Sequence, residues 1–501
     1  MDPSTSGESG EQGSNRFSRR TLLIGGGTLG VAALGGIAFG VDQWVESGAP
    51  PASPDVHSFR SRPDLHPAKI TVVVPAAGTA SGLVFLALLA GPGQMGPMIV
   101  DNLGNPIWLH PVKQGSAANL QVQSYRGKPV LAWWEGQVVS PGYGLGQGIL
   151  MDSSYQQIAR ISAGDGLKVD LHELTLTPEG TALITVYQKK RADLSSVNGP
   201  RRGLLLDSLI QEIDIATGRV VFRWDAHDHV RLNESYVSVP QSGAPFDFFH
   251  INSIDVDTDG NLLISARHTW TVYKINRTTG EIMWRLNGKR SDFTMGPRTQ
   301  FVFQHDARHQ PGNEITLFDD GGGPQNVDAR SRGLKLRLDF AQKRAEFVRE
   351  FLPDPAFLTT SQGSMQVLDN GNAFVGWGSE PYWSEYASDG RLLFDAKLPT
   401  KGDSYRTFRF EWQGQPRSLP AMAAQRYHDR IKAWVSWNGA TSVESWELLA
   451  GSSPGALSSV ATAPRTGFET ELSASTRATY VAVAARASSG KLLARSHAVR
   501  V

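Results

Sequence analysis

Three histidines occupy matching places in three apolar hairpin sequences, and an arginine stands at the far end of one of these hairpins. They are His172 in LHELTL, His250 in FHINSI and His305 in FQHDAR, and the arginine is Arg267 in LLISAR. Imidazole is a nucleophile and a proton carrier near neutral pH, and a guanidinium binds the oxygens of an anion. This set predicts transfer of a phosphoryl or sulfuryl group, whose transition state spreads charge over oxygens that fixed donors can hold.

The stretch 248–267 predicts a hairpin that brings two of these side chains together. An alternating run begins at His250, a tight turn follows at Thr258-Asp259-Gly260, and an apolar strand returns. Pairing across this turn sets His250 opposite Arg267 and His268. Strand alternation would send Arg267 and His268 to opposite faces, so only one of the two is expected in the site.

The same register places the other two histidines at the same end of their own hairpins. His172 is expected near Tyr187, and His305 near Asp319. At the equivalent place the two remaining inner hairpins carry polar residues instead, namely Gln121 or Gln123 in one and Gln362 or Ser364 in the other. Three imidazoles and Arg267 are therefore predicted to surround one opening.

Two other interpretations of the histidines stay open at this point. The pairs His172-Glu173 and His305-Asp306 could be structural hydrogen bonds that tie neighbouring sheets together, because buried polar groups need partners. Three histidines could also hold zinc, although a cation would be repelled by Arg267. Cofactor loops of the GxxxxGK[ST] type, or GxGxxG after a strand, are absent from the sequence. We therefore expect no metal and no cofactor.

The elements that would position these residues are two kinds of hairpin in alternation. The outer kind occurs six times, at 99–108, 149–161, 211–224, 272–284, 336–351 and 385–398. A more apolar inner kind precedes five of them, at 120–134, 171–187, 248–267, 303–319 and 363–377, and the sixth inner pair is divided between 82–89 and 404–412. Six four-stranded units closed by joining the two ends of the repeat predict a six-bladed β-propeller.

The remaining segments complete an all-β protein with an unusual amino terminus. Arg19-Arg20 before an uncharged apolar run resembles a twin-arginine export signal, so 1–41 is interpreted as a signal, or as a membrane anchor if it stays uncleaved. Residues 42–66 are expected to be a flexible linker, and 67–414 the propeller. Short alternating strands over 415–501 predict a small β-sandwich of the fibronectin or immunoglobulin type.

Composition excludes several classes of function. The 501 residues include 49 basic and 48 acidic ones, so nothing indicates a nucleic-acid binder. The chain contains no cysteine, which excludes disulfides, thiolate metal sites and cysteine nucleophiles. Contact with a membrane is expected only through the amino-terminal segment, and the predicted location is outside the cytoplasm.

Four segments also resemble a known family. LHELTLTPEGTALI, FHINSIDVDTDGNLLISAR, GEIMWRLNG and FQHDARHQPGNEITLFDDG are similar to the bacterial and fungal arylsulfotransferases that do not use phosphoadenosine phosphosulfate. The resemblance covers about 70–415 and implies a six-bladed propeller that moves a sulfuryl group from an aryl sulfate donor to a phenol acceptor through a sulfohistidine. It implies that His305 is the nucleophile, and that His172, His250 and Arg267 bind the sulfate and assist proton transfer.

The chain departs from the better-known periplasmic members in its additional parts. Those members carry an extra amino-terminal β-domain and a cysteine pair, where this chain has a linker, a carboxy-terminal domain and no cysteine. A second functional hypothesis is an exported, non-catalytic propeller that binds a glycan, an anionic cell-wall ligand or a protein. Simple binding would not need the ring of histidines, so this ring separates the two hypotheses.

Overall fold

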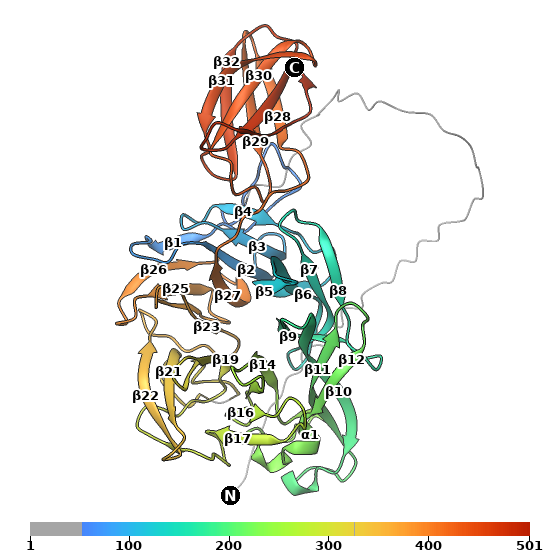
Figure 1. Ribbon diagram of the computed structural model, residues 1–501, viewed down its shortest axis with the longest axis vertical. Helices are drawn as coiled ribbons and strands as arrows, with labels where there is room; N and C mark the ends of the chain where they lie inside the picture. Colours follow the sequence, from blue (N-terminus) through green and yellow to red (C-terminus); the bar gives the residue numbers. More distant parts are fainter. Residues whose placement is uncertain (1–52, 325) are drawn as a thin grey trace, which may run out of the picture. The chain divides into compact units, whose positions relative to one another are not determined.

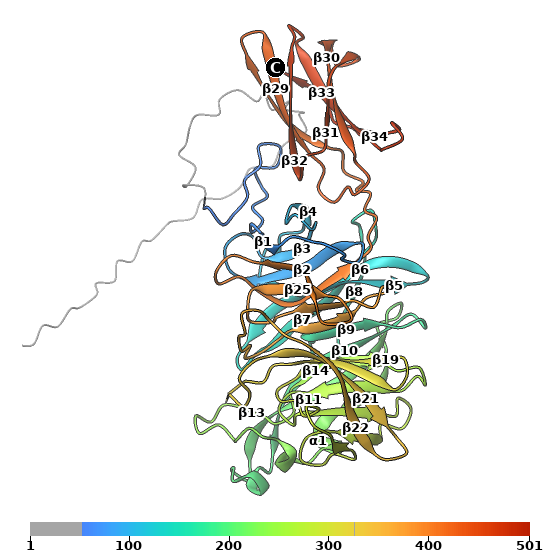
Figure 2. The ribbon, with the colours of Figure 1, turned by 90° about the vertical axis from the view of Figure 1, so that its left-hand side faces the viewer.

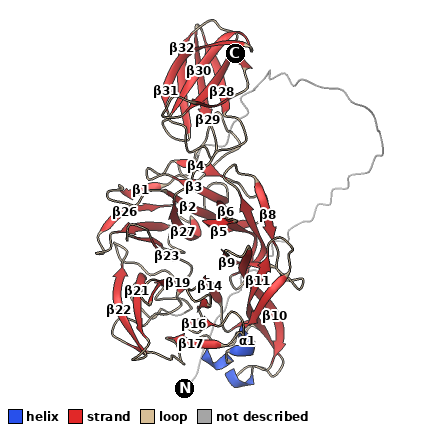
Figure 3. Ribbon diagram, viewed as in Figure 1, coloured by secondary structure: helices blue, strands red, loops and turns tan. Residues whose placement is uncertain are grey.

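The computed structural model describes residues 53–324 and 326–501, and these fold almost wholly as β-strands (Figures 1 and 3). The described part holds one short α-helix, α1 (Ala226–His229), and two 3-10 turns. The prediction of an all-β protein is therefore confirmed. The predicted signal at 1–41 and the first part of the predicted linker lie outside the described residues.

Most strands pair antiparallel in groups of four that follow the chain order. The first groups are β5 (Ser116–Tyr125), β6 (Lys128–Val139), β7 (Tyr143–Met151) and β8 (Gln157–Ile161), then β9 (Val169–Leu176), β10 (Thr181–Ala192), β11 (Gly203–Asp214) and β12 (Val220–Asp225). A bridge between Gly146 of β7 and Val169 of β9 joins these two groups into one nine-stranded sheet, in which β13 (Phe246–Asp247) pairs with β11. Next come β14 (Ile251–Val256), β15 (Leu262–Ala266), β16 (Thr271–Ile275) and β17 (Ile282–Leu286), then β19 (His305–Gln310), β20 (Glu314–Asp319), β21 (Arg332–Asp339) and β22 (Arg344–Phe351). The group β23 (Ser364–Val367), β24 (Ala373–Gly376), β25 (Tyr382–Tyr386) and β26 (Leu392–Lys397) takes β1 (Thr71–Val74) as a fifth strand.

The remaining group joins the two ends of the repeat. Strands β2 (Leu83–Ala90), β3 (Gly96–Val100) and β4 (Pro106–Leu109) are completed by β27 (Asp403–Phe410), which pairs antiparallel with β2. The pairing runs from Leu83 opposite Phe410 to Ala90 opposite Asp403. The predicted division of this inner pair between 82–89 and 404–412 is therefore observed.

The innermost strand of each group faces a common centre (Figure 1). These strands contact one another in the cyclic order β5, β9, β14, β19, β23 and β27, and β27 contacts β5 again. Apolar side chains fill the space between neighbouring groups; Phe85 and Ile99, for example, share one buried cluster with Leu131 and Trp133. Because strands alternate their side chains, both faces of a sheet supply this packing: Phe85 of β2 belongs to this cluster, whereas Val84 and Leu86 of the same strand belong to another.

The carboxy-terminal residues form two further sheets around one core (Figure 2). One sheet contains β28 (Ala421–Tyr427), β29 (Arg430–Ser436) and β32 (Glu469–Ser475), and the other contains β30 (Ser445–Ser453), β31 (Ala456–Pro464), β33 (Tyr480–Arg486), β34 (Leu492–Arg495) and β35 (Val499–Arg500). Val435 and Leu472 of the first sheet share a buried cluster with Trp446 and Val483 of the second.

The expectation of a flexible linker over 42–66 is wrong for its described part. Leu65 is buried, and the backbone N–H of Ser61 donates to Oε1 of Glu469 at 2.6 Å. The rings of Phe59 and Phe468 lie 4.4 Å apart. The prediction relied on the proline and serine content of this stretch. It overlooked Phe59 and Leu65, whose side chains belong to the same apolar cluster as Phe468. Among the helices of 53–324 and 326–501, none has the length and apolar character needed to cross a bilayer.

Candidate active site

The four side chains singled out in the sequence meet in one cavity at the starting ends of the inner strands. His172, His250, Arg267 and His305 line a space of about 190 Å³ together with Tyr405. The rings of His172 and His250 lie 4.9 Å apart, edge to face. The prediction that these groups lie close together is thus observed in the structure. His227 and His229 belong to α1 and line a separate surface hollow.

The expectation that Arg267 and His268 point to opposite faces is wrong. Strand β15 ends at Ala266, so the alternation of a strand no longer applies to the two residues that follow. The backbone N–H of Arg267 donates to the carbonyl of His250 at 2.9 Å, and that of His268 donates to the carbonyl of Phe249. Both side chains consequently reach the site, with His268 4.7 Å from the ring of His250.

Each of the three histidines is held by a buried aspartate that the sequence analysis missed. The Nδ1 atoms of His172, His250 and His305 lie 2.6 Å from Asp170, Asp247 and Asp320 respectively. The acids that follow two of the histidines are not their partners. Glu173 and Asp306 bind arginines instead, and the partner of His305 is one residue beyond the expected Asp319. The short spacings DLH, DFFH and FDD were the available signals in the sequence.

The hydrogen bonds of His305 fix its tautomer. The backbone N–H of Gln362 points at Nε2 of His305 with a separation of 3.3 Å, so this nitrogen is an acceptor. The proton therefore lies on Nδ1 and is donated to Oδ2 of Asp320. Burial, with a further contribution from the charge of Arg267, holds the pKa of His305 well below its ordinary value. His305 thus presents a neutral imidazole with a lone pair on Nε2, which is the form that attacks an electrophile.

The pair His172 and Asp170 differs in its electrostatics. Asp170 also accepts hydrogen bonds from the backbone N–H of Gly144 and from the hydroxyl of Thr185. Burial on its own would raise the pKa of Asp170, but the attraction of His172 and these hydrogen bonds outweigh it and lower the pKa. An ionised Asp170 accepts the Nδ1–H of His172 and orients the ring, which leaves its Nε2 for proton transfer in the cavity.

In the pair His250 and Asp247, by contrast, the pKa shifts favour the uncharged form of both side chains. Burial raises the pKa of Asp247. Burial, followed by the nearby positive charges of His172 and Arg267, holds the pKa of His250 well below its ordinary value. His250 also has a positive φ of 57°, in the left-handed region that few residues other than glycine adopt. This backbone strain at a buried, neutral imidazole is typical of a residue held in place for function.

Arg267 is oriented by two acceptors. Its Nη2 donates to the carbonyl of Thr360 at 2.7 Å, and its Nη1 lies 2.9 Å from Nε2 of His268. The ring of Phe303 lies against the guanidinium at 4.9 Å. Because these contacts use only part of its donors, the guanidinium keeps N–H groups for an anion in the cavity.

His268 is the acceptor that aims this guanidinium. Its Nδ1 lies 2.6 Å from the carbonyl of Asp247, which only an N–H can approach so closely, so Nε2 is free to accept from Arg267. Burial lowers the pKa of His268 to about 3, which keeps the ring neutral. Asp247, His250 and His268 have ligand atoms within 4.8 Å of one another, as a metal site requires, but both ring nitrogens of His268 already have hydrogen-bond partners.

Comparison with known proteins gives one family match. The model described as Arylsulfotransferase (ASST) matches residues 121–398. Among curated proteins, none matches the chain.

The similar solved structures are distant in sequence. A protein of unknown function from Bacteroides caccae is 13% identical, with 65% of this chain and 98% of that chain covered and a TM-score of 0.40. A catalytically inactive virginiamycin B lyase from Staphylococcus aureus is 10% identical, with 74% and 96% covered and a TM-score of 0.34. Regucalcin from Agrobacterium tumefaciens, described as a calcium-binding protein, is 11% identical, with 65% and 83% covered and a TM-score of 0.33.

Proposed function

Because the match over residues 121–398 spans more than half of the chain, the protein belongs to the arylsulfotransferase family, and we propose that it transfers a sulfuryl group from an aryl sulfate to a phenol through His305. The observation that carries this proposal is the tautomer of His305. Its Nε2 carries the lone pair and accepts a hydrogen bond of 3.3 Å from the backbone N–H of Gln362, which the donor sulfur would displace. Arg267 and His172 line the same cavity.

In the first half of the reaction, Nε2 of His305 attacks the sulfur of the donor. The N–S bond forms, the bond from sulfur to the aryl oxygen breaks, and the proton of His172 passes to the departing phenolate. Arg267 binds the sulfuryl oxygens. Asp320 accepts the Nδ1–H of His305 and so stabilises the positive charge that sulfation places on the ring.

In the second half, the oxygen of the acceptor phenol attacks the same sulfur. The N–S bond breaks, its electron pair returns to Nε2 of His305, and the phenolic proton passes to His172. Donor and acceptor visit one site in turn, so ping-pong kinetics are expected. This scheme uses neither a nucleotide sulfate donor nor a metal, so treatment with a chelator should leave the activity intact.

Replacement of His305 tests the proposal directly. We expect His305→Ala to reduce transfer from a chromogenic aryl sulfate to background and to abolish the acid-labile sulfur label on the protein, because the atom that bonds to sulfur is gone. His172→Ala and His250→Ala should each lower the rate of transfer roughly 10²–10⁴-fold, the range for loss of a general acid or of a group that stabilises charge. Mass spectrometry of donor-treated protein locates the label.

The matched control is His309→Ala, which removes another histidine of β19 whose Nε2 lies 3.1 Å from Asp257 rather than in the cavity. It should keep its activity. A fully active enzyme without a label on His305 would refute the mechanism. Absence of activity in the wild-type chain with every aryl sulfate would favour the non-catalytic, ligand-binding alternative.

Two finer features of the molecule are part of the same proposal. The cyclic contacts of the inner strands support a six-bladed propeller over 67–414, and the shared core of the last two sheets supports a β-sandwich over 415–501. The pair Arg19-Arg20 before the apolar run supports export of the folded enzyme by the twin-arginine route, with membrane contact only through 1–41.

A further inference from the structure

We propose that Arg406 is a positioning residue that sets the three histidines of the site relative to one another. This inference rests on the proposed function of those histidines. Arg406 lies on β27, its side chain is fully buried, and it follows Tyr405, which lines the cavity. It does not line the cavity itself, so it acts through other residues.

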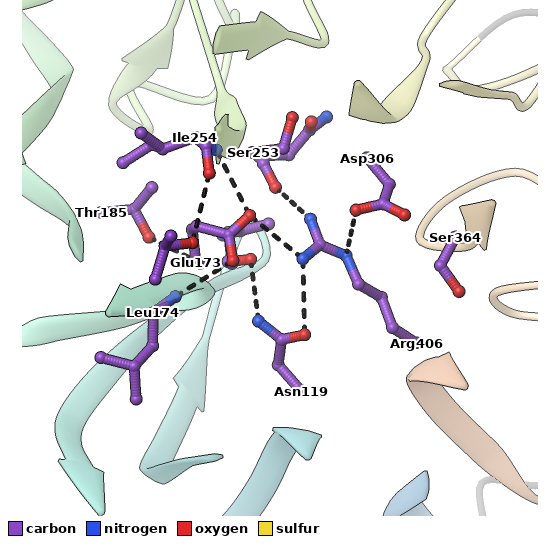
Figure 4. Close-up of polar contacts among 12 residues, drawn as sticks. Asn119, Glu173, Leu174, Thr185, Ser253, Ile254, Asp306, Ser364 and Arg406 are labelled. Atoms are coloured by element: carbon purple, nitrogen blue, oxygen red, sulfur yellow. Dashed lines mark hydrogen bonds and ion pairs between the residues drawn. The ribbon is translucent and has the colours of Figure 1, made fainter. Parts of the chain in front are cut away.

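The guanidinium of Arg406 contacts three of the inner strands at once (Figure 4). Nη1 donates to Oε2 of Glu173 on β9 at 3.2 Å, and Nη2 donates to the carbonyl of Asn252 on β14 at 2.7 Å. Nε lies 3.5 Å from Oδ1 of Asp306 on β19. Asn119 of β5 provides a fourth contact at 3.4 Å.

Three of these partners lie within two residues of one of the histidines in the chain. Glu173 follows His172 directly, Asp306 follows His305 directly, and Asn252 lies two residues after His250. A shift of Arg406 would therefore move the backbone that carries each imidazole. Since reacting atoms must be held within fractions of an ångström, a common anchor for three groups on three separate sheets has a direct effect on chemistry.

Irregular strand pairing makes this arrangement possible. The ladders between β9 and β10, between β14 and β15, and between β19 and β20 are each interrupted at or just after the histidine. The interruption includes His172 on β9, lies at Asn252 on β14, and follows His305 on β19. Such an interruption releases backbone groups from the ladder and redirects side chains. The carbonyl of Asn252 is then available to Arg406, and Asp306 adopts a positive φ of 55°. The interrupted ladders need a partner from elsewhere, and Arg406 supplies it.

The cluster around Arg406 is balanced in charge. Two cations, Arg406 and Arg308, face two anions, Glu173 and Asp306, and the Nη2 of Arg308 binds Glu173 at 2.6 Å. Burial would raise the pKa of Glu173, but Arg308 and Arg406 outweigh it and lower the pKa, so the carboxylate stays ionised. Lysine would keep the charge and lose the planar fork that reaches three strands, so Arg406→Lys tests geometry and not charge.

Arg409 provides the matched control on the same strand. It is equally buried, and its Nε lies 2.8 Å from Oε2 of Glu385, remote from the residues that flank the histidines. Arg409→Lys should lower the melting temperature without changing transfer. Arg406→Lys should lower kcat by at least about 10-fold, the scale of a misplaced catalytic group, while the KM of a small donor changes little because Arg267 is untouched.

A second readout does not depend on activity. The ring nitrogens of the histidines can be followed by NMR in ¹⁵N-histidine-labelled protein, and each signal is assigned by replacing one histidine at a time. The signals of His172, His250 and His305 should all shift in Arg406→Lys. They should stay in place in Arg409→Lys. If Arg406→Lys fails to fold, Glu173→Gln replaces it, with Glu385→Gln as its control.

The outcomes separate this inference from the proposed function. If the wild-type protein acquires no sulfur label on a histidine, the proposed function is overturned. The ¹⁵N signals would still show whether Arg406 positions the three histidine rings. Unshifted histidine signals in Arg406→Lys, or an equal loss of kcat in Arg406→Lys and Arg409→Lys, would overturn the role of Arg406.

Discussion

At the scale of the residue, the three imidazoles have the same kind of partner, but the pKa values of these partners are shifted in different directions. Every Nδ1 faces an aspartate, yet only Asp170 has a pKa that its hydrogen bonds and His172 hold low, while burial raises the pKa of Asp247 and Asp320. The hydrogen bonds to each carboxylate, rather than its pairing with a histidine alone, therefore distinguish the aspartate with a lowered pKa from the two with a raised pKa.

The carboxylate of Asp320 should control the tautomer of His305. In Asp320→Asn the amide N–H would face Nδ1, so the ring proton would move to Nε2 and block the lone pair. We expect a loss of about 10³–10⁴-fold in kcat, the effect that a wrong tautomer has in a serine protease triad. The measurement is the rate of label incorporation in a single turnover. Asp319→Asn is the control, because this neighbouring acid binds Arg332 and should affect only stability.

His268 should make the protein less stable in acid. Its pKa is about 3 in the folded chain and near 6.5 when unfolded, so below about pH 6.5 only the unfolded state takes up this proton. The stabilisation is complete above about pH 6.5 and is lost as the pH falls, by up to about 1.4 kcal/mol per unit. His268→Gln should therefore show a shallower fall in unfolding free energy between about pH 6 and 4.5. His309→Gln is the control for loss of a histidine, and equal slopes in wild type and His268→Gln would contradict the assignment.

At the scale of the element, the alternation of apolar and polar residues along the strands was enough to predict the hairpins. It was not enough to predict the hydrogen-bond partners of the histidines. Alternation located the strand pairs and placed His250 opposite Arg267, as observed. It failed at His268 because β15 ends one residue before Arg267, and at Asp306 because the ladder of β19 is interrupted there. Such interruptions depend on contacts from distant strands, and Arg406 lies about a hundred residues from Asp306 in the sequence. No local pattern could reveal them.

The pairing of β2 with β27 can be tested by a cross-link, since the chain has no cysteine to interfere. Leu83 and Phe410 are opposite one another in this ladder and only half-buried. The double variant Leu83→Cys with Phe410→Cys should oxidise to a disulfide and raise the melting temperature, because the link closes a loop of several hundred residues in the unfolded chain. Reduction should cancel the gain. If no disulfide forms in the folded protein, these strands are not paired.

At the scale of the whole molecule, the proposed export signal at the amino terminus is compatible with the fold. The twin-arginine route carries proteins that are already folded, which suits a ring of sheets closed by its own first and last strands. The variant Arg19→Lys with Arg20→Lys should therefore leave active enzyme inside the cell. Fractionation with an activity assay measures this, and unchanged export would show that another route is used.

The position of β27 in the chain has a consequence for unfinished products of translation. This strand is the last of the ring, and it supplies both Tyr405 at the cavity and Arg406 beneath it. A polypeptide that is broken off after residue 305 but before residue 403 already contains all three histidines and Arg267, yet lacks the contacts of β27 with the strands that carry them. Under the proposed mechanism we expect such fragments, from stalled ribosomes or proteolysis, to be inactive until the last strand of the ring is added.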